Sequence, residues 1–188
     1  MFEGLKLNEQ KNNKEKISIT LHNIGVAFYK MKNYKKALRY YDQSLDVKIG
    51  IKDSFDLDRL YINRGLCHSF LKNYSDAIKI TQEGLSICGS ACSPYTKIDG
   101  YFGLGVAYFG LNNIPDALAY FQRSCTLAKE NKVYRLQGDN LIYLGKIAFQ
   151  QDNQEKAAEY LEEASEIAKE HGYNELLLSA YEELLIRT

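Results

Sequence analysis

The sequence contains no tryptophan, only two prolines and no net charge, and each absence excludes something. Its 24 Lys and Arg residues are balanced by 24 Asp and Glu residues, whereas a nucleic-acid-binding domain usually carries a basic excess on one face. The same balance supplies no polybasic segment for an anionic membrane surface. Few prolines together with fifteen tyrosines suit a helical protein that packs aromatic rings between helices. We therefore expect neither a nucleic-acid partner nor a membrane partner.

Long apolar runs are also missing. No uninterrupted apolar stretch approaches the roughly 18 residues of a membrane-spanning helix. The first ten residues lack a basic region followed by an apolar core, so we expect no secretory signal. Four cysteines in a chain of this size are compatible with reduced thiols, which favours a cytoplasmic location.

Three residue types return at a period of forty residues. The repeated positions are Gly25, Gly65, Gly105 and Gly145, then Asn33, Asn73, Asn113 and Asn153, then Ala37, Ala77, Ala117 and Ala157. Three residue types that recur with the same period in four copies indicate stacked supersecondary units rather than an effect of composition. Such an array has no single central core, because each repeat packs on its neighbours.

Each period contains two segments with helical periodicity. From Lys16 to Met31 apolar residues recur at helical spacing, and Lys32-Asn33 interrupts the pattern. Asparagine tolerates the left-handed conformation of a helix end, so we expect it to form the turn. Two helices with so short a link pack antiparallel as neighbours. The expected helices span 16–31, 34–49, 57–71, 74–87, 94–111, 114–130, 133–151 and 154–171.

Both ends of the sequence match incomplete repeats. Gly4 lies two periods before Gly84, so the first residues correspond to the second helix of a repeat, and a polar link follows at 8–14. Tyr181 stands two periods after Tyr101, so the tail corresponds to a first helix. The predicted division of the single array 1–188 is a partial repeat 1–14, four repeats 15–53, 54–93, 94–132 and 133–173, and a partial repeat or capping helix 174–188. The half-repeats either cap a complete array or mark the 188 residues as a segment of a longer array, and we favour the segment.

The repeated residues resemble the tetratricopeptide repeat, whose two helices carry a large residue, Leu-Gly and Tyr, then Ala, Phe and Ala. The third copy shows this pattern as Tyr101, Leu104, Gly105, Tyr108, Ala117, Phe121 and Ser124. The second copy diverges most, because Arg64 and Thr81 stand at apolar positions and predict looser packing or a polar contact. The resemblance implies an all-α superhelix, or solenoid, of antiparallel helix pairs that binds proteins or peptides.

The family's usual period is about 34 residues, so a period of forty implies added helix around the link between repeats. Forty-residue versions are similar to arrays in bacterial sensor kinases, in peptide-responsive bacterial regulators and in animal G-protein-signalling modulators.

In this family the first helix of each repeat lines the concave surface. By position the resemblance selects a peptide-binding groove of His22, Asn23, Val26, Tyr29, Ile62, Asn63, Leu66, Ser69, Phe70, Phe102, Val106, Phe109, Ile142, Tyr143, Lys146 and Phe149. So apolar a surface favours an apolar segment of a protein or peptide as the partner. The alternative is that several rings fill the gap between neighbouring first helices.

Asn23 and Asn63 lie one period apart, each two residues before a repeated glycine. An amide offers a donor and an acceptor, so it can bind an extended peptide backbone, as asparagines here do in the family. Equally, each amide could bond a neighbouring repeat.

One subfamily holds a peptide carboxylate with a clamp of Lys, Asn and Arg. Asn63 matches the clamp asparagine, but His22 and Val26 stand where Lys and Asn are needed. Asp99 and Gly103 stand where Lys and Arg are needed. Without these cations little would hold a carboxylate, so we exclude this specificity.

Cys88 and Cys92 are four residues apart and could form half of a metal site. No histidine or second cysteine pair lies near them in sequence, whereas structural zinc takes four ligands. A labile disulfide is a further alternative, and plain thiols at a helix end are our main expectation. The sequence contains no phosphate loop, nucleophile elbow or metalloprotease motif. We therefore expect no metal, no cofactor and no enzyme activity.

Three functions follow from these observations. The first is a protein- or peptide-binding scaffold that uses the concave face. The second is a ligand-sensing segment of a larger bacterial regulator or sensor kinase. The third is a self-associating array, a homo-oligomer held by the half-repeats at its ends.

Overall fold

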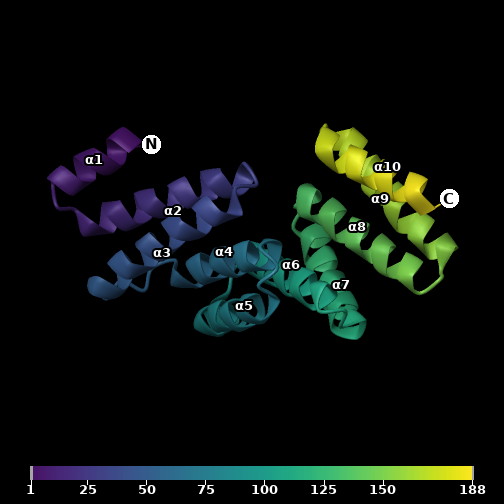
Figure 1. Cartoon of the computed structure of the whole chain (residues 1–188), viewed down its shortest axis with the longest axis horizontal. Helices are drawn as coiled ribbons and strands as arrows, with labels where there is room; N and C mark the ends of the chain where they lie inside the picture. Colours follow the sequence, from purple (N-terminus) through teal and green to yellow (C-terminus); the bar gives the residue numbers. More distant parts are fainter. Residues whose placement is uncertain (1, 188) are drawn as a thin grey trace. The chain divides into compact units, whose positions relative to one another are not determined.

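The computed structural model describes the backbone of residues 2–187 and the side chains of residues 2–185. Within these residues the chain forms ten α-helices, one short 3₁₀ helix and no strand, which confirms the all-α class (Figure 1). The chain divides into two compact bodies. We call them the N-terminal body, Met1–Cys92, and the C-terminal body, Ser93–Thr188, and describe each by itself.

The N-terminal body contains two helical hairpins and one additional helix. Its elements are α1 (Phe2–Gln10), α2 (Lys14–Lys30), α3 (Tyr34–Gly50), α4 (Leu57–Phe70), α5 (Tyr74–Cys88) and the 3₁₀ helix η1 (Gly89–Ala91). The helices α2 and α3 pack on each other, as do α4 and α5, and α1 packs on α2 (Figure 1). Each predicted helix of this body is present within a residue or two of its predicted bounds.

The C-terminal body repeats the arrangement. Its elements are α6 (Pro94–Gly110), α7 (Ile114–Glu130), α8 (Tyr134–Gln150), α9 (Gln154–His171) and α10 (Asn174–Arg187). The hairpins are α6 with α7 and α8 with α9, and α10 packs on α8 and α9. Ser93 caps α6 by accepting a hydrogen bond from the Thr96 N–H at 3.1 Å, as Ser-Pro at a helix start predicts.

The turn inside each hairpin corrects one prediction. The residue before the repeated asparagine takes the left-handed conformation, with φ at 57° for Lys32 and 58° for Asn112. Asn33 instead caps α3, because its side-chain oxygen accepts a hydrogen bond from the Lys36 N–H at 3.2 Å. The expectation that the asparagine itself is left-handed was wrong, since its oxygen satisfies an amide that the next helix leaves without a partner.

The same turn shortens the first link. Asn12 is left-handed, with φ at 47°, and the Asn13 side chain accepts from the Lys16 N–H at 3.0 Å. The helix α1 therefore continues to Gln10, and the link spans 11–13 rather than 8–14.

The two helices of a hairpin meet at a repeated glycine. A Cβ at Gly25 would lie 2.5 Å from Cε1 of Tyr41, and one at Gly105 would lie 2.7 Å from Cδ1 of Phe121. Both rings are fully buried, so they have no space into which to retreat. In the first hairpin the Ser44 hydroxyl also donates to the Ser18 carbonyl across the two helices, at 2.8 Å.

Of the two divergent residues of the second repeat, Arg64 makes the predicted polar contact and Thr81 does not. Arg64 Nε donates to Asp42 Oδ1 at 2.8 Å and so joins α4 to α3.

A buried lysine fixes the link that follows α3. Lys48 is 2% exposed, and its Nζ donates to Asp53 Oδ2 and to the Phe55 carbonyl, each at 2.6 Å.

In three of the four hairpins the period of forty is accommodated by helix length, whereas α4 and α5 have 14 and 15 residues and are flanked by longer links. Six helices of the four hairpins have 17 or 18 residues, and the link between α7 and α8 is only three residues long. This agrees with the added helix that the sequence predicts.

We expect Gly25→Ala to destabilise the fold. Overpacking against Tyr41 costs about 1–3 kcal/mol, and the better helix propensity of alanine offsets up to about 1 kcal/mol. Urea unfolding followed by circular dichroism measures the difference. The control is Gly50→Ala in the same hairpin, because a Cβ at Gly50 meets no atom within 4 Å. Equal unfolding midpoints for the two variants would contradict the close approach of α2 and α3.

Candidate binding face of the first helices

We call the surface of α2 and α4, and separately that of α6 and α8, the first-helix face of each body. The sixteen residues that the sequence selects differ in burial: some are buried, some are partly exposed and a single one is exposed. The buried residues are His22, Ile62, Leu66, Ser69, Phe102, Val106 and Ile142. The partly exposed residues are Val26, Tyr29, Asn63, Phe70, Phe109, Tyr143, Lys146 and Phe149, and Asn23 is exposed.

Three rings form a cluster on the N-terminal body. Tyr34 stacks on Phe70 with a centroid distance of 4.7 Å, and Tyr29 meets Phe70 edge-on at 6.1 Å. Tyr29 and Phe70 are partly exposed, and they come from neighbouring first helices. The cluster therefore covers the gap between α2 and α4 and leaves part of its aromatic surface in solvent.

In the C-terminal body one ring fills the corresponding gap. Tyr143 stacks on Phe121 at 4.7 Å and meets Phe102 and Phe109 edge-on at 5.8 and 5.6 Å. Phe102 and Phe121 are buried, so this part of the predicted groove packs α6, α7 and α8 together. Lys146 pairs with Glu183 at 2.9 Å and lies over the Tyr143 ring.

The two predicted asparagines differ in their surroundings. The Asn63 amide nitrogen lies 2.8 Å from Nε2 of His22, and it joins α4 to α2. Because an amide N–H can only donate, Nε2 of His22 accepts this bond. Asn23 is exposed one residue along from His22. Asn63 therefore makes the contact between repeats that was the alternative to peptide binding, and Asn23 faces solvent.

His22 is a buried neutral imidazole. Its side chain is 4% exposed, and its ring packs edge-on against Tyr41 at 5.4 Å. Burial is the main cause that lowers the pKa of His22 to about 4, and the nearby Arg59 guanidinium lowers it further. Asp56 opposes this shift, and Lys48 adds to it.

Two further residues share the face of the N-terminal body and were not selected from the sequence. Ile19 and Arg59 lie four residues before Asn23 and Asn63, one helical turn away. Ile19 is 47% exposed, and the Arg59 side chain, which pairs with Asp56 at 3.1 Å, is 52% exposed. Extending the selected positions by one turn would have found both.

A separate hollow lies along the second helix α7. It is open to solvent, has a volume of about 490 Å³ and is lined mainly by α7, with Gln122, Arg123 and Leu127 among its residues. It contains none of the sixteen predicted groove residues. It belongs to the C-terminal body and supplies a comparison surface outside the predicted groove.

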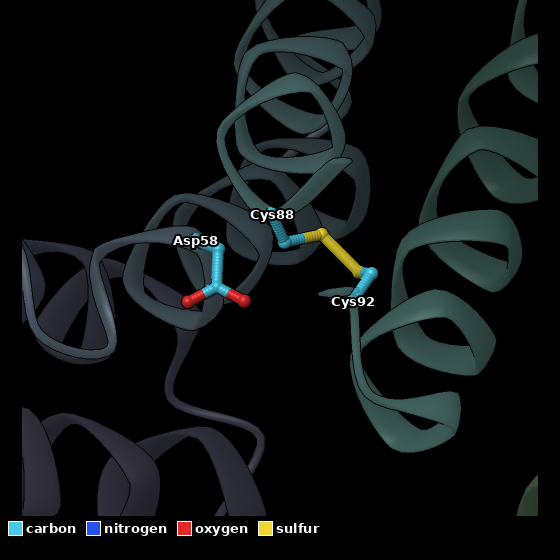
Figure 2. Close-up of side chains that lie close together, drawn as sticks. All are labelled: Asp58, Cys88 and Cys92. Atoms are coloured by element: carbon cyan, nitrogen blue, oxygen red, sulfur yellow. A yellow bond between two sulfur atoms is a disulfide. The ribbon is translucent and has the colours of Figure 1, made fainter. Parts of the chain in front are cut away.

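The cysteines correct another prediction. Cys88 and Cys92 form a disulfide, so the expectation of plain thiols was wrong for this pair, whereas Cys67 and Cys125 are free. Among the described residues, Asp58 of α4 brings its carboxylate within 4.8 Å of both sulfur atoms (Figure 2). The sequence did not indicate Asp58, because thirty residues separate it from Cys88.

No helix in residues 2–187 combines the length and the apolar character that crossing a membrane requires.

Comparison with known proteins identifies one family and several solved structures with the same fold. The family model of the tetratricopeptide repeat matches residues 16–90 and 101–170, well over half of the chain. No curated protein matches the chain in sequence.

Solved structures match over most of this chain. One is a signal-transduction ATPase with a tetratricopeptide repeat sensor from Pyrococcus horikoshii, with a TM-score of 0.68 and 20% identity over 95% of this chain and 30% of that one. Another is the Rap conjugation gene regulator of plasmid pLS20 in complex with the Phr* peptide, with a TM-score of 0.70 and 17% identity over 94% of this chain and 54% of that one.

A third is aspartyl phosphate phosphatase F from Bacillus subtilis, with a TM-score of 0.65 and 20% identity over 85% of this chain and 42% of that one. The chain thus spans less than two thirds of the length of each of these three structures. At these identities the likeness shows the fold alone.

We expect His22 to make the protein sensitive to acid. Its pKa of about 4 in the fold lies below the ordinary value of 6.5, so the unfolded chain binds more protons between these values. Stability therefore falls as the pH falls from 6.5 to 4, by up to about 3 kcal/mol from this residue. His22→Gln should remove this contribution to the dependence of the free energy of unfolding on pH.

Urea unfolding at a series of pH values measures the slope. His171→Gln is the control, because His171 lies at the end of α9, stacked on Tyr134. Burial also lowers the pKa of His68, which stays in both variants. An unchanged acid slope in His22→Gln would show that folding does not lower the pKa of His22.

Proposed function

Because the chain belongs to the tetratricopeptide-repeat family, we propose that it is a non-catalytic scaffold that binds a segment of another protein or a peptide on its first-helix faces. One observation carries the proposal. On the N-terminal body Asn23 and Ile19 of α2 are exposed, and the rings of Tyr29 and Phe70 on the two first helices are partly exposed. An amide together with apolar and aromatic groups on these helices suits a segment that offers backbone groups and apolar side chains.

Burial divides the sixteen selected residues into two roles. We assign direct contact with the partner to the exposed and partly exposed residues, with Asn23, Tyr29 and Phe70 at their centre. The buried residues, such as His22 and Leu66, hold the first helices in position beneath them. Asn63 belongs to both groups, because it is partly exposed while it holds His22.

The partner segment is proposed to be apolar with few charges. On the N-terminal body Arg59 is already paired with Asp56, and on the C-terminal body Lys146 is paired with Glu183. A highly charged segment would have to displace these ion pairs. Apolar contact with the partly exposed rings requires no such exchange.

A sensing segment of a larger bacterial regulator is the second candidate. Two structures with this fold carry names that point this way: a signal-transduction ATPase whose repeats are described as a sensor, and a conjugation regulator held in complex with a peptide. Both are longer than this chain. In this version, binding on a first-helix face would signal to a domain elsewhere in the regulator.

Self-association through the half-repeats is the third candidate, and one residue opposes it. Leu185 stands one period after Gly145, and its side chain is 77% exposed on α10. A second helix packed on α10 as in the complete hairpins would meet a leucine at this position, whereas in the fourth hairpin even a Cβ added at Gly145 would lie 2.9 Å from Cγ of Leu161. We therefore rank a homo-oligomer of this geometry last; sedimentation measures the mass in solution.

A cytoplasmic location is part of the proposal. In a reducing compartment disulfides are transient, so the Cys88–Cys92 bridge would open and close there.

We expect Asn23→Ala to weaken peptide binding without harming the fold. Peptides selected from a random library on the immobilised chain provide the ligand, and fluorescence anisotropy measures their affinity. Loss of one net hydrogen bond of about 1 kcal/mol corresponds to about fivefold weaker binding. Ile19→Ser should also weaken binding, since it removes apolar contact surface.

The matched control is Gln122→Ala, which changes the hollow along α7 and leaves the first-helix face intact. Asn63→Ala is unsuitable as the only probe, because it removes the hydrogen bond to buried His22 and so also affects stability. Peptides that lose affinity for Gln122→Ala but keep it for Asn23→Ala and Ile19→Ser would place binding on α7 and refute the proposed face.

A further inference from the structure

The site beside the disulfide is built by the packing of α5 on α4. Gly84 of α5 has no side chain at the crossing, and a Cβ there would lie 3.0 Å from the carbonyl oxygen of Asp58. Cys88 lies four residues after Gly84, so it is on the same face one turn later. The close crossing therefore places the last residue of α5 beside the first turn of α4.

The chain then returns to the same place. After Cys88, η1 leads to Cys92, whose Cα lies 4.6 Å from that of Cys88. Cys92 is 7% exposed, whereas Asp58 and Cys88 are partly exposed, so the group can be reached from solvent on one side. Figure 2 shows the Asp58 side chain next to the bridged sulfurs.

We propose that reduction of the Cys88–Cys92 bridge opens a binding site for a soft divalent cation such as Zn²⁺, with the two cysteine sulfurs and one Asp58 oxygen as ligands. The three ligand atoms lie within 4.8 Å of one another. Two ligands of a tetrahedral zinc at about 2.3 Å stand roughly 3.8 Å apart, so the two sulfurs, bonded to each other in the bridge, have to separate to that distance after reduction, while the Asp58 oxygen is already close to both.

The chemistry balances with a dithiol as the reductant. The dithiol gives two electrons and two protons to the bridge, which becomes two thiols, and the dithiol itself becomes a disulfide. The cation then binds the two thiolates, and two protons are released to solvent. Asp58 supplies the third ligand, and the fourth position is left to water or to a ligand from outside the chain.

The charge of the site favours a divalent ion. Two thiolates and one carboxylate carry three negative charges, which the cation partly neutralises. Thiolate ligands select soft or borderline cations over Mg²⁺ and Ca²⁺. The remaining cysteines do not compete, because burial raises the pKa of Cys67 to about 12 and that of Cys125 to about 11.

Cadmium titration of the whole chain tests the site. The protein is reduced with a dithiol, desalted under nitrogen and titrated with Cd²⁺, and the ultraviolet charge-transfer band of the cadmium–thiolate bond is recorded. We expect one Cd²⁺ per reduced chain and no band in the oxidised chain. The oxidised protein keeps Cys67 and Cys125 as thiols, so it controls for both without a substitution.

Variants test Asp58. Asp58→Asn should weaken Cd²⁺ binding at least about tenfold, the lower end of what even outer-shell changes cost at metal sites. Asp56→Asn removes the same charge two residues away and should leave the affinity nearly unchanged. Cys88→Ser leaves only the Cys92 thiolate and should weaken both the band and the affinity, and circular dichroism checks that each variant is folded.

Two results would overturn the site. A band of equal strength in the oxidised and reduced chains would mean that Cys88 and Cys92 are not the ligands. Equal affinities for Asp58→Asn and Asp56→Asn would mean that Asp58 does not ligate. Neither result depends on peptide binding, so the cation site and the proposed function stand or fall separately.

Discussion

In each hairpin a glycine of the first helix leaves room for a side chain sixteen residues later on the second helix. Tyr41 and Phe121 occupy this room against Gly25 and Gly105, and both rings are fully buried there. Because protein interiors are close-packed, no other residue fits at these glycines without moving a ring. The contact therefore sets the separation of the two helices, and with it the direction in which the first helix presents its remaining face.

The first-helix face packs neighbouring repeats together and also exposes side chains to solvent, and the two bodies differ in which of these roles its aromatic rings have. In the C-terminal body Tyr143 is stacked on Phe121, so the ring mainly joins repeats. In the N-terminal body Tyr29 and Phe70 meet over the gap between α2 and α4 while remaining partly exposed. The N-terminal body is therefore the better candidate for binding, because amide and apolar groups both reach solvent there.

Several polar groups in this protein join neighbouring elements. His22 and Asn63 connect two first helices, and Lys48 holds the link between two hairpins through Asp53. Since a buried polar group without a partner costs about 1–3 kcal/mol, each of these pairs restricts how its elements can pack. A repeat array has few contacts between distant residues, so such local pairs have a large share in fixing its geometry.

The sequence alone determined the helices, their pairing and the family, because a period of forty and helical spacing are visible in one dimension. It also selected the positions of the first-helix face. Only the tertiary structure decided that His22 is buried while the adjacent Asn23 is exposed, and that Asp58 meets Cys88 and Cys92. The reason is that periodicity gives the direction of a side chain on its own helix. Its burial and its partners depend on what the neighbouring helix places opposite it.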